Sequence, residues 1–334
     1  MATIYDIARH VGVSAGTVSR ALSRPEKVLP ATRQRIEHAA AALGYVPNTV
    51  ARTLKTQRSG KILVTVPDIA NPFFAQILQG AEDAALAAGY AVLLGDTQHQ
   101  PAREERYAQM LLRNEADGLI VLGHRLPPTV RRIVKRLGAA APVVNGCEFD
   151  PALGIPSVHI DNAAAARTAM EHLYALGHEH IAVIGGPPEN PLHQQRLEGA
   201  RAAARARGRL RRLVLMPGDF SVESGYAAAK DLLGRTPAPT AAFCFSDQMA
   251  LGALAACRDL GVHVPEAFSI VGFDDLASSR YLSPPLTTIA QPMRELGARA
   301  VGLLLAVIGP DRVPRQQTLE FSLMLRGSTA APPR

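Results

Sequence analysis

Short apolar runs alternate with helix-length stretches along most of this chain. From Lys61 onward, seven runs have the length and composition of buried strands: KILVTVPD, AVLLGDT, GLIVLG, PVVNGC, IAVIGG, AAFCFSD and FSIVGFD. Between them lie stretches of helical length such as PFFAQILQGAEDAALAAG and DNAAAARTAMEHLYALG. This repeated order of strand and helix predicts parallel sheets with helices on both faces.

The strands are too many for one comfortable sheet. We therefore predict that 60–334 forms an α/β core of two doubly wound parallel-sheet subdomains. The first takes in about 61–160 plus 289–325, because a C-terminal stretch crosses back to complete it, and the second takes in 161–288. A ligand crevice is expected between the halves, outside the carboxyl ends of the strands.

The N-terminal segment has a different pattern. Thr3 can cap a first helix, YDIARHVG, and Gly12 permits a tight turn before a second helix, AGTVSRAL, capped by Ser14. A third helix follows from Pro30. Three short helices with a glycine turn between the first two predict an all-α helix-turn-helix headpiece over 1–46, with a generic three-helix bundle as the alternative.

Positive charge is concentrated at the same end of the chain. Residues 1–60 contain nine Lys or Arg and three acids, a net charge of +6, whereas the whole chain carries +7. A basic head on a nearly neutral body is the electrostatic pattern of a nucleic-acid-binding protein. The alternative is that a basic end only aids solubility.

The second helix of the headpiece carries side chains suited to DNA. If it is a recognition helix, Arg20 can hold a guanine with two hydrogen bonds, Ala15 can touch a thymine methyl, and Gly16 allows close approach. Hydroxyl groups on the same helix suit phosphate oxygens, which position a protein without specifying sequence: Ser14, Thr17 and Ser19. We expect modest direct readout and a strong dependence on salt.

The segment 47–59 predicts a hinge helix between headpiece and core. Asn48 can help to open it, and Ala51 and Leu54 lie three residues apart on one face. Beside the basic residues of this segment, such an apolar pair can act as a minor-groove wedge, with the leucine unstacking a base step. Packing of the pair against a domain surface is the alternative.

Candidate ligand-binding groups follow the apolar runs of the core. Asp161, Asp247 and Asp274 each come at the end of such a run. Carboxylates and a guanidinium can each bind adjacent sugar hydroxyls with paired hydrogen bonds, and Arg196 is the cationic partner we expect. A helix cap is the alternative for each Asp, above all for Asp247.

Aromatic side chains are expected to complete this pocket. Phe73 and Phe74 lie in one strand-to-helix loop and Phe220 in another. Their flat rings could sandwich a sugar or a base. One member of the adjacent pair is expected to belong to the core instead.

Composition and motifs exclude several classes. The cysteines Cys147, Cys244 and Cys257 are widely spaced and lie in or beside apolar runs, which favours buried, reduced thiols. The N-terminus lacks the apolar core of a secretory peptide, and no run of 18 apolar residues occurs, so a cytoplasmic protein without membrane contact is expected.

Catalytic interpretations find little support in the sequence. There is no GxxxxGK[ST] phosphate loop, GxSxG elbow or HExxH zinc motif, so we expect no catalytic residue, metal or cofactor and no enzyme activity. His178 and His180 lie in a turn, which is more typical of a solvated loop than of a metal site. A solute-binding transport protein and a nucleoside-processing enzyme remain as rival classes, but the first needs an export signal and the second a catalytic group.

The headpiece and hinge residues carry a specific resemblance. TIYDIARHVGVSAGTVSRAL and LGYVPNTVARTLKTQRSG resemble the headpiece and hinge of the LacI/GalR family of bacterial transcription regulators, and the remainder resembles that family's periplasmic-binding-protein-like core. VPDIANPFF, VHIDN, PLHQQRLEGA, GDFSVESG, SDQMALGAL and PPLTTIAQP are most similar to the family's cytidine-responsive members.

The resemblance implies a repressor controlled by a small sugar or a cytidine-like nucleoside. By the same comparison Ala15, Gly16 and Arg20 read bases, and hinge helices with an intercalating Leu54 pair in a homodimer on bent, near-palindromic double-stranded operator DNA. It also implies that a nucleoside or pentose lies among the three phenylalanines, with its hydroxyls on Arg196 and Asp274. The additional tetramerising helix of some relatives has no counterpart in this sequence.

Overall fold

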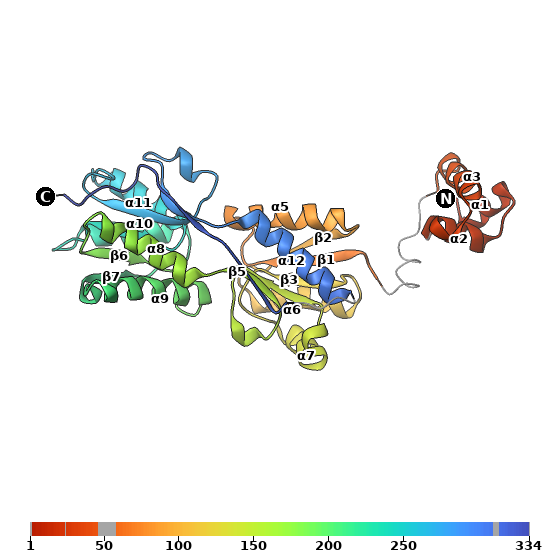
Figure 1. The fold of residues 1–334 in the computed structure, drawn as a ribbon, viewed down its shortest axis with the longest axis horizontal. Coiled ribbons are helices and arrows are strands. Elements are labelled where there is room, and N and C mark those ends of the chain that lie inside the picture. The colour runs from red at the N-terminus through yellow and green to blue at the C-terminus, as the bar shows by residue number, and fades with distance from the viewer. Residues whose placement is uncertain (1, 24, 46–57, 310–313, 334) are drawn as a thin grey trace. The chain divides into compact units, whose positions relative to one another are not determined.

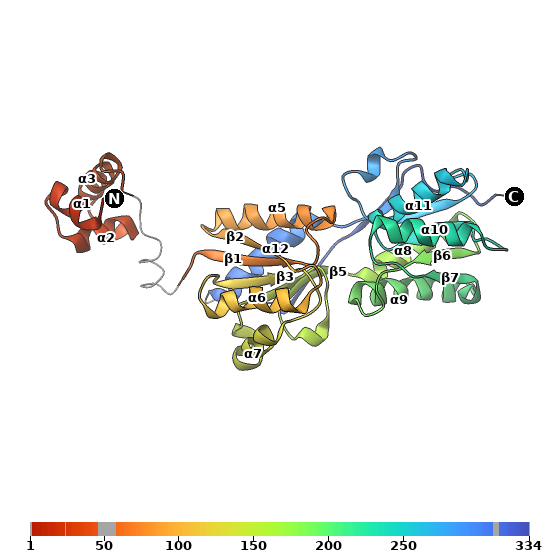
Figure 2. The same ribbon diagram turned by 180° about the vertical axis from the view of Figure 1, so that it is seen from behind.

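The computed structural model of the protein describes residues 2–23, 25–45, 58–309 and 314–333. The chain divides into two compact units, Met1–Ser59 and Gly60–Arg334. In the larger unit, two six-stranded sheets form two halves of similar architecture (Figures 1 and 2). A headpiece joined to a two-sheet α/β core is the fold that the sequence predicts.

The small unit is a three-helix headpiece. Its helices are α1 (Ile4–Val11), α2 (Ala15–Ser23) and α3 (Pro30–Ala42). Thr3 and Asp6 form a capping box at the start of α1, and Gly12, with φ +73°, turns the chain towards α2. The helices share a core in which Ile7, Val18 and Ile36 are fully buried.

The first half of the large unit is built on the sheet β11-β5-β4-β3-β1-β2, with all neighbouring strands parallel. Its strands and helices are β1 (Lys61–Val66), α5 (Pro72–Ala87), β2 (Ala91–Asp96), α6 (Pro101–Leu112), β3 (Gly118–Val121), α7 (Pro128–Leu137), β4 (Val143–Gly146), β5 (Ser157–Ile160), α12 (Met293–Ile308) and β11 (Gln316–Leu319).

Strand β1 shows why this sheet is covered on both faces. Its side chains alternate between two cores: Ile62 and Val64 pack in the cluster that contains residues of α5 and α12, and Leu63 packs in the cluster that contains residues of α6 and α7. The four helices accordingly lie on opposite faces of the sheet (Figure 1). A continuous apolar strand sequence is the signature of such double coverage.

The second half is built on the sheet β12-β10-β9-β8-β6-β7, in which only β12 is antiparallel to its neighbour. Its strands and helices are α8 (Asn162–Ala175), β6 (Ile181–Ile184), α9 (Pro191–Ala206), β7 (Leu213–Met216), α10 (Val222–Leu233), β8 (Ala241–Cys244), α11 (Asp247–Asp259), β9 (Ser269–Asp274), β10 (Thr287–Ala290) and β12 (Ser322–Met324).

The described chain passes between the halves three times, after β5, between β10 and α12, and between β11 and β12. The sequence predicted one C-terminal return, with 289–325 in the first half. The structure differs, because all of β10 pairs with β9, and β12 then pairs with β10, which places both strands in the second sheet. The two halves are therefore connected by three chain segments.

The close crossing of α12 over α5 yields a stability prediction. A Cβ added at Gly297 would lie 1.9 Å from the carbonyl oxygen of Ile77 on α5, so the two helix backbones must separate in Gly297→Ala. We expect this substitution to lower the free energy of unfolding by about 1–3 kcal/mol. The matched control is Gly302→Ala on the same helix, where a Cβ meets nothing within 4 Å and helix propensity improves by up to about 1 kcal/mol. Urea unfolding measures the stabilities of the two variants. Equal stabilities would contradict the close contact between α12 and α5 at Gly297.

Candidate functional site

The N-terminal turn of α2 presents a polar surface on the headpiece. The Ser14 Oγ accepts a hydrogen bond from the Thr17 backbone N–H at 3.1 Å, so this serine caps the helix. Ser14, Gly16 and Arg20 are exposed, whereas Val18 of the same helix is fully buried. The Arg20 Nε donates to the Gly16 carbonyl at 3.2 Å. One face of α2 is therefore open for contact, and the other is held in the core.

The remaining headpiece candidates are less exposed. Ala15, Thr17 and Ser19 are half-buried, and Ala15 packs against the headpiece core. The three hinge candidates lie outside the described residues: Asn48, Ala51 and Leu54.

A cavity of about 640 Å³ lies between the two halves of the large unit. It is bordered by loops at the carboxyl ends of β1, β2, β3 and β4 from the first half, and of β6, β7, β8 and β9 from the second. Five of the seven residues predicted to bind an effector line it: Phe73, Phe74, Arg196, Phe220 and Asp274.

Aromatic rings from both halves contribute to the walls. Phe73 and Phe74, at the start of α5, are in edge-to-face contact with their ring centroids 5.2 Å apart. Both are 5% exposed and belong to the core of the first half, although the sequence assigned only one to the core. Phe220 comes from the second half and lies over Gly186, where a Cβ would be 2.2 Å from the Phe220 ring. The missing side chain at Gly186 makes room for this ring.

Arg196 of α9 and Asp274 at the end of β9 provide buried charge in the cavity. The Arg196 Nε donates to Asn162 Oδ1 at 3.0 Å, another guanidinium N–H donates to the Phe245 carbonyl, and the guanidinium lies 3.6 Å from the centroid of the Phe273 ring. These contacts fix the side chain and use only part of its five donors.

Asp274 has an unusual backbone and an unusual acidity. Its φ is +121°, a conformation that L-residues rarely adopt. Burial raises the pKa of its carboxyl to about 8, although the Arg196 guanidinium acts in the opposite direction. Gln291, between β10 and α12, donates a hydrogen bond to it at 2.7 Å. Near neutral pH the carboxyl can therefore both donate and accept hydrogen bonds.

Strained backbone is concentrated around the cavity. Among the described non-glycine residues, three that line it have positive φ: His99 (+54°), Phe220 (+69°) and Asp274 (+121°). Such conformations cost about 1–3 kcal/mol each and tend to occur at functional sites. This clustering supports a binding role for the cavity independently of its side-chain chemistry.

Two predicted effector residues do not line the cavity. Asp161 is exposed and caps α8, with its carboxylate accepting from the Ala164 N–H at 2.8 Å. Asp247 is buried, but Ser246 caps α11 in its place. The Asp247 carboxylate instead accepts hydrogen bonds from the Leu276 N–H and from two hydroxyls on the following segment. Of the three aspartates at the ends of strands, the structure therefore brings only Asp274 to the cavity.

The structure adds residues that the sequence did not single out. Glu148 follows β4 and is 5% exposed, and its carboxylate is bonded to His124 Nδ1 at 2.8 Å. The same carboxylate accepts a hydrogen bond at 3.3 Å from Asn190, the N-cap residue of α9 in the other half. The sequence did contain a signal for these two residues, because Glu148 and His124 both follow apolar runs, as Asp274 does. This contact joins the two halves directly across the cavity.

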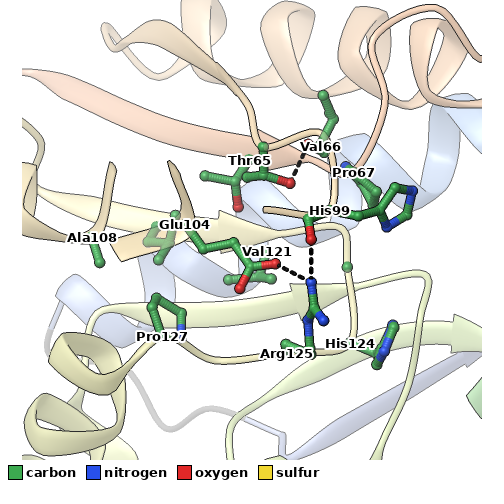
Figure 3. Close-up of a pocket in the computed structure, with 13 residues that line it drawn as sticks. Thr65, Val66, Pro67, His99, Glu104, Ala108, Val121, His124, Arg125 and Pro127 are labelled. Carbon is green, nitrogen blue, oxygen red and sulfur yellow. Dashed lines mark hydrogen bonds and ion pairs between the residues drawn. The ribbon is translucent and has the colours of Figure 1, made fainter. Parts of the chain in front are cut away.

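A small chamber of about 30 Å³ lies beside the main cavity, within the first half (Figure 3). Pro67, His99, His124 and Arg125 line both spaces. Figure 3 shows the Arg125 guanidinium between the Glu104 carboxylate, at 3.0 Å, and the His99 carbonyl, at 2.8 Å. Arg125 is thereby held by two acceptors at the border of the cavity.

Two other features of the described residues bear on the class of protein. No described helix is long and apolar enough to cross a bilayer. The described side chains also include no group of three potential ligands placed to hold a metal ion.

His178, predicted to lie in a solvated loop, is 2% exposed and bonded to Thr240 and the Ala330 carbonyl.

Comparisons with known proteins agree with this architecture. A model of bacterial regulatory proteins of the lacI family matches residues 3–48, and a model of the periplasmic binding protein-like domain matches residues 170–329. The chain is 43% identical over 338 residues to the HTH-type transcriptional repressor CytR of Escherichia coli (strain K12), an alignment that covers 99% of this chain and 97% of CytR.

Comparisons with solved structures agree with these sequence comparisons. The lac repressor dimer bound to operator and the anti-inducer ONPF matches with a TM-score of 0.89 and 31% identity, over 99% of each chain. A LacI family regulator from Enterococcus faecium with bound ribose matches with a TM-score of 0.73 and 30% identity, over 81% of this chain and 99% of the other. Headpiece, core and cavity together define a DNA-binding transcription regulator rather than an enzyme. The chain belongs to the LacI family of bacterial regulatory proteins.

Proposed function

We propose that this protein is a cytoplasmic repressor that binds a near-palindromic operator as a homodimer, and that a nucleoside or pentose in the core cavity controls its affinity for DNA. The observation that carries the ligand assignment is the composition of the cavity. Aromatic rings from both halves are combined there with a buried guanidinium and a buried carboxyl. This combination suits a ligand with a flat or apolar face and several hydroxyls.

The cavity size and one relative support the ligand class. A volume of about 640 Å³ is within the usual range of roughly 300–1,000 Å³ for small-molecule sites. The Enterococcus faecium regulator holds ribose, a pentose. A pentose can place its hydroxyls on Arg196 and Asp274, and the base of a nucleoside can extend between the rings of Phe74 and Phe220.

The DNA-binding assignment uses the open face of α2 and the hinge. Arg20, Gly16 and Ala15 contact base edges, and the hydroxyls of the same helix hold phosphates. In the hinge, Leu54 enters the minor groove. The similar lac repressor structure is a dimer on operator, which supports the same assembly for this chain.

Control requires that the ligand bind one conformation of the core more tightly than another. The three crossings between the halves permit a change in their relative orientation, and the cavity is bordered by both. A ligand that contacts both halves therefore favours one orientation. Since the chain between headpiece and core runs into β1, that orientation can be transmitted to the hinge.

Calorimetric titration of the full-length protein with cytidine, uridine, adenosine and ribose tests the ligand class. We expect at least one of them to bind, and we expect Phe220→Ala to weaken that binding about tenfold or more through loss of one aromatic wall. Absence of binding by all four would refute the nucleoside or pentose assignment and leave the DNA-binding assignment unaffected.

A further inference from the structure

The charges that line the cavity are unevenly matched. Two arginines and two histidines face six acids. The arginines and one of the histidines each have a nearby acid or backbone carbonyl as a partner. The charges that line the cavity therefore indicate which ligand charge the cavity can accept.

Arg125 is the cation that lies nearest to solvent. Its side chain is 41% exposed, but one of its guanidinium nitrogens donates both to Glu104 Oε1 at 3.0 Å and to the His99 carbonyl at 2.8 Å (Figure 3). The Glu104 side chain is only 16% exposed, so this ion pair is partly shielded from water. Glu104 lines the small chamber and not the main cavity, and it acts on the cavity only through Arg125.

The other two basic side chains considered, His124 and Arg196, are also held by groups of the protein. His124 is bonded to the buried carboxylate of Glu148 at 2.8 Å. Arg196 is held by Asn162 and the Phe245 carbonyl and interacts electrostatically with Asp274. For Arg125 the partner is a carboxylate of the protein itself, so no ligand anion is needed to balance its charge.

The acids at the border of the second half have no such balance. Glu189, Asp219 and Glu223 line the cavity, as does Asp68 from the first half, and none of the four belongs to an ion pair among the described residues. A negative ligand group entering the cavity would meet this unbalanced charge, which raises the free energy of an anion there.

We propose that Glu104 sets the charge selectivity of the site: by neutralising Arg125 it makes the cavity select uncharged, hydroxyl-bearing ligands and reject their phosphorylated forms. A phosphate dianion needs cations or several N–H donors that are not already engaged. Here the charge of the border cation Arg125 is already offset by Glu104, and the unpaired acids nearby repel the anion. The inference rests on the proposed function, since it decides between a nucleoside and a nucleotide at the same site.

The test compares matched pairs of ligands on the full-length protein by calorimetry. The probes are cytidine and cytidine 5′-monophosphate, and ribose and ribose 5-phosphate. We expect the uncharged member of the binding pair to bind at least about tenfold more tightly than its phosphate, the effect of one unbalanced unit charge near the ligand. Equal affinity for the two members, or tighter binding of the phosphate, would overturn the proposal while leaving a small-molecule site in place. Failure of all four probes would instead refute the proposed ligand class, and this inference with it.

A variant tests the role of Glu104 specifically. Glu104→Gln keeps the size of the side chain and a hydrogen-bond acceptor but removes the charge that neutralises Arg125. We expect affinity for the phosphate to rise about tenfold while affinity for the uncharged ligand changes less than about twofold. Glu115→Gln is the matched control, because Glu115 is paired with Arg113 at 3.9 Å and lines neither the cavity nor the chamber. An equal response in the two variants, or no gain for the phosphate in Glu104→Gln, would contradict the proposal, since a purely structural role does not change the ratio of the two affinities.

Discussion

Arg196→Ala should abolish the response of the protein to its ligand and should also destabilise the core. Two effects combine in this variant. The ligand loses charge-assisted hydrogen bonds worth about 1.5–3 kcal/mol, and the buried Asn162 and Phe245 oxygens lose their donor, which costs about 1–3 kcal/mol. We expect ligand affinity to fall by at least about tenfold and the unfolding midpoint to fall by several degrees.

Arg201→Ala is the matched control for this prediction. Arg201 lies on the exposed side of the same helix, α9, and does not line the cavity. Its removal should leave both ligand affinity and unfolding midpoint close to those of the parent protein. Calorimetry and thermal unfolding measure the two quantities. Retention of ligand affinity in Arg196→Ala would show that the guanidinium supports the fold alone.

Removal of residues 1–59 should abolish operator binding and leave ligand binding unchanged. The headpiece has its own core, centred on Ile7, Val18 and Ile36, and the core unit begins at Gly60. The exposed face of α2 and most of the excess positive charge are lost with this segment. We expect specific DNA affinity to fall by about 1,000-fold or more, to the range of non-specific binding or below.

The full-length protein is the control for the truncated one, measured in the same buffer because DNA affinity depends steeply on salt. Fluorescence anisotropy with labelled DNA and calorimetry with the ligand give the two affinities. Substantial specific DNA binding by residues 60–334 would contradict the assignment of the headpiece. A loss of ligand affinity would show that the two units depend on each other.

The sequence predicted the fold where burial controls composition. Strands such as β1 and β9 are buried on both faces and therefore have continuous apolar sequences that can be recognised without a structure. Strands β7, β10, β11 and β12 are absent from the predicted runs. Three of them, β7, β11 and β12, lie at sheet edges and have exposed positions, whereas β10, TTIA, is buried but contains two threonines. Their pairing also depends on contacts distant in sequence.

The site residues were predicted less completely than the fold, because their roles depend on local backbone conformation. Asp161, Asp247 and Asp274 occupy equivalent positions at the ends of strands, and only the path of the chain that follows decides their roles. Asp161 is followed immediately by a helix and caps it, whereas Asp274 adopts a positive φ and is not at a helix start. Asp247 lost the capping role to the neighbouring Ser246. These outcomes depend on backbone conformation, which residue type alone does not specify.

Contacts across the cavity could not be predicted from patterns along the chain. Glu148 and Asn190 are 42 residues apart and meet only because the two halves face each other. Arg125 likewise meets Glu104 because the loop after β3 lies beside the first turn of α6. The contacts behind the proposed charge selectivity are therefore visible only in the structure.

The most direct test of the account is the affinity of the full-length protein for DNA with and without its ligand. Operator DNA is first selected from a random pool by the protein itself, and anisotropy titrations are then carried out with and without saturating cytidine or ribose, whichever binds by calorimetry. We expect the ligand to change specific DNA affinity about tenfold or more, in the direction of release, because coupling of 1–3 kcal/mol is typical of such regulators. An unchanged DNA affinity in the presence of bound ligand would contradict the central claim that the cavity controls the headpiece.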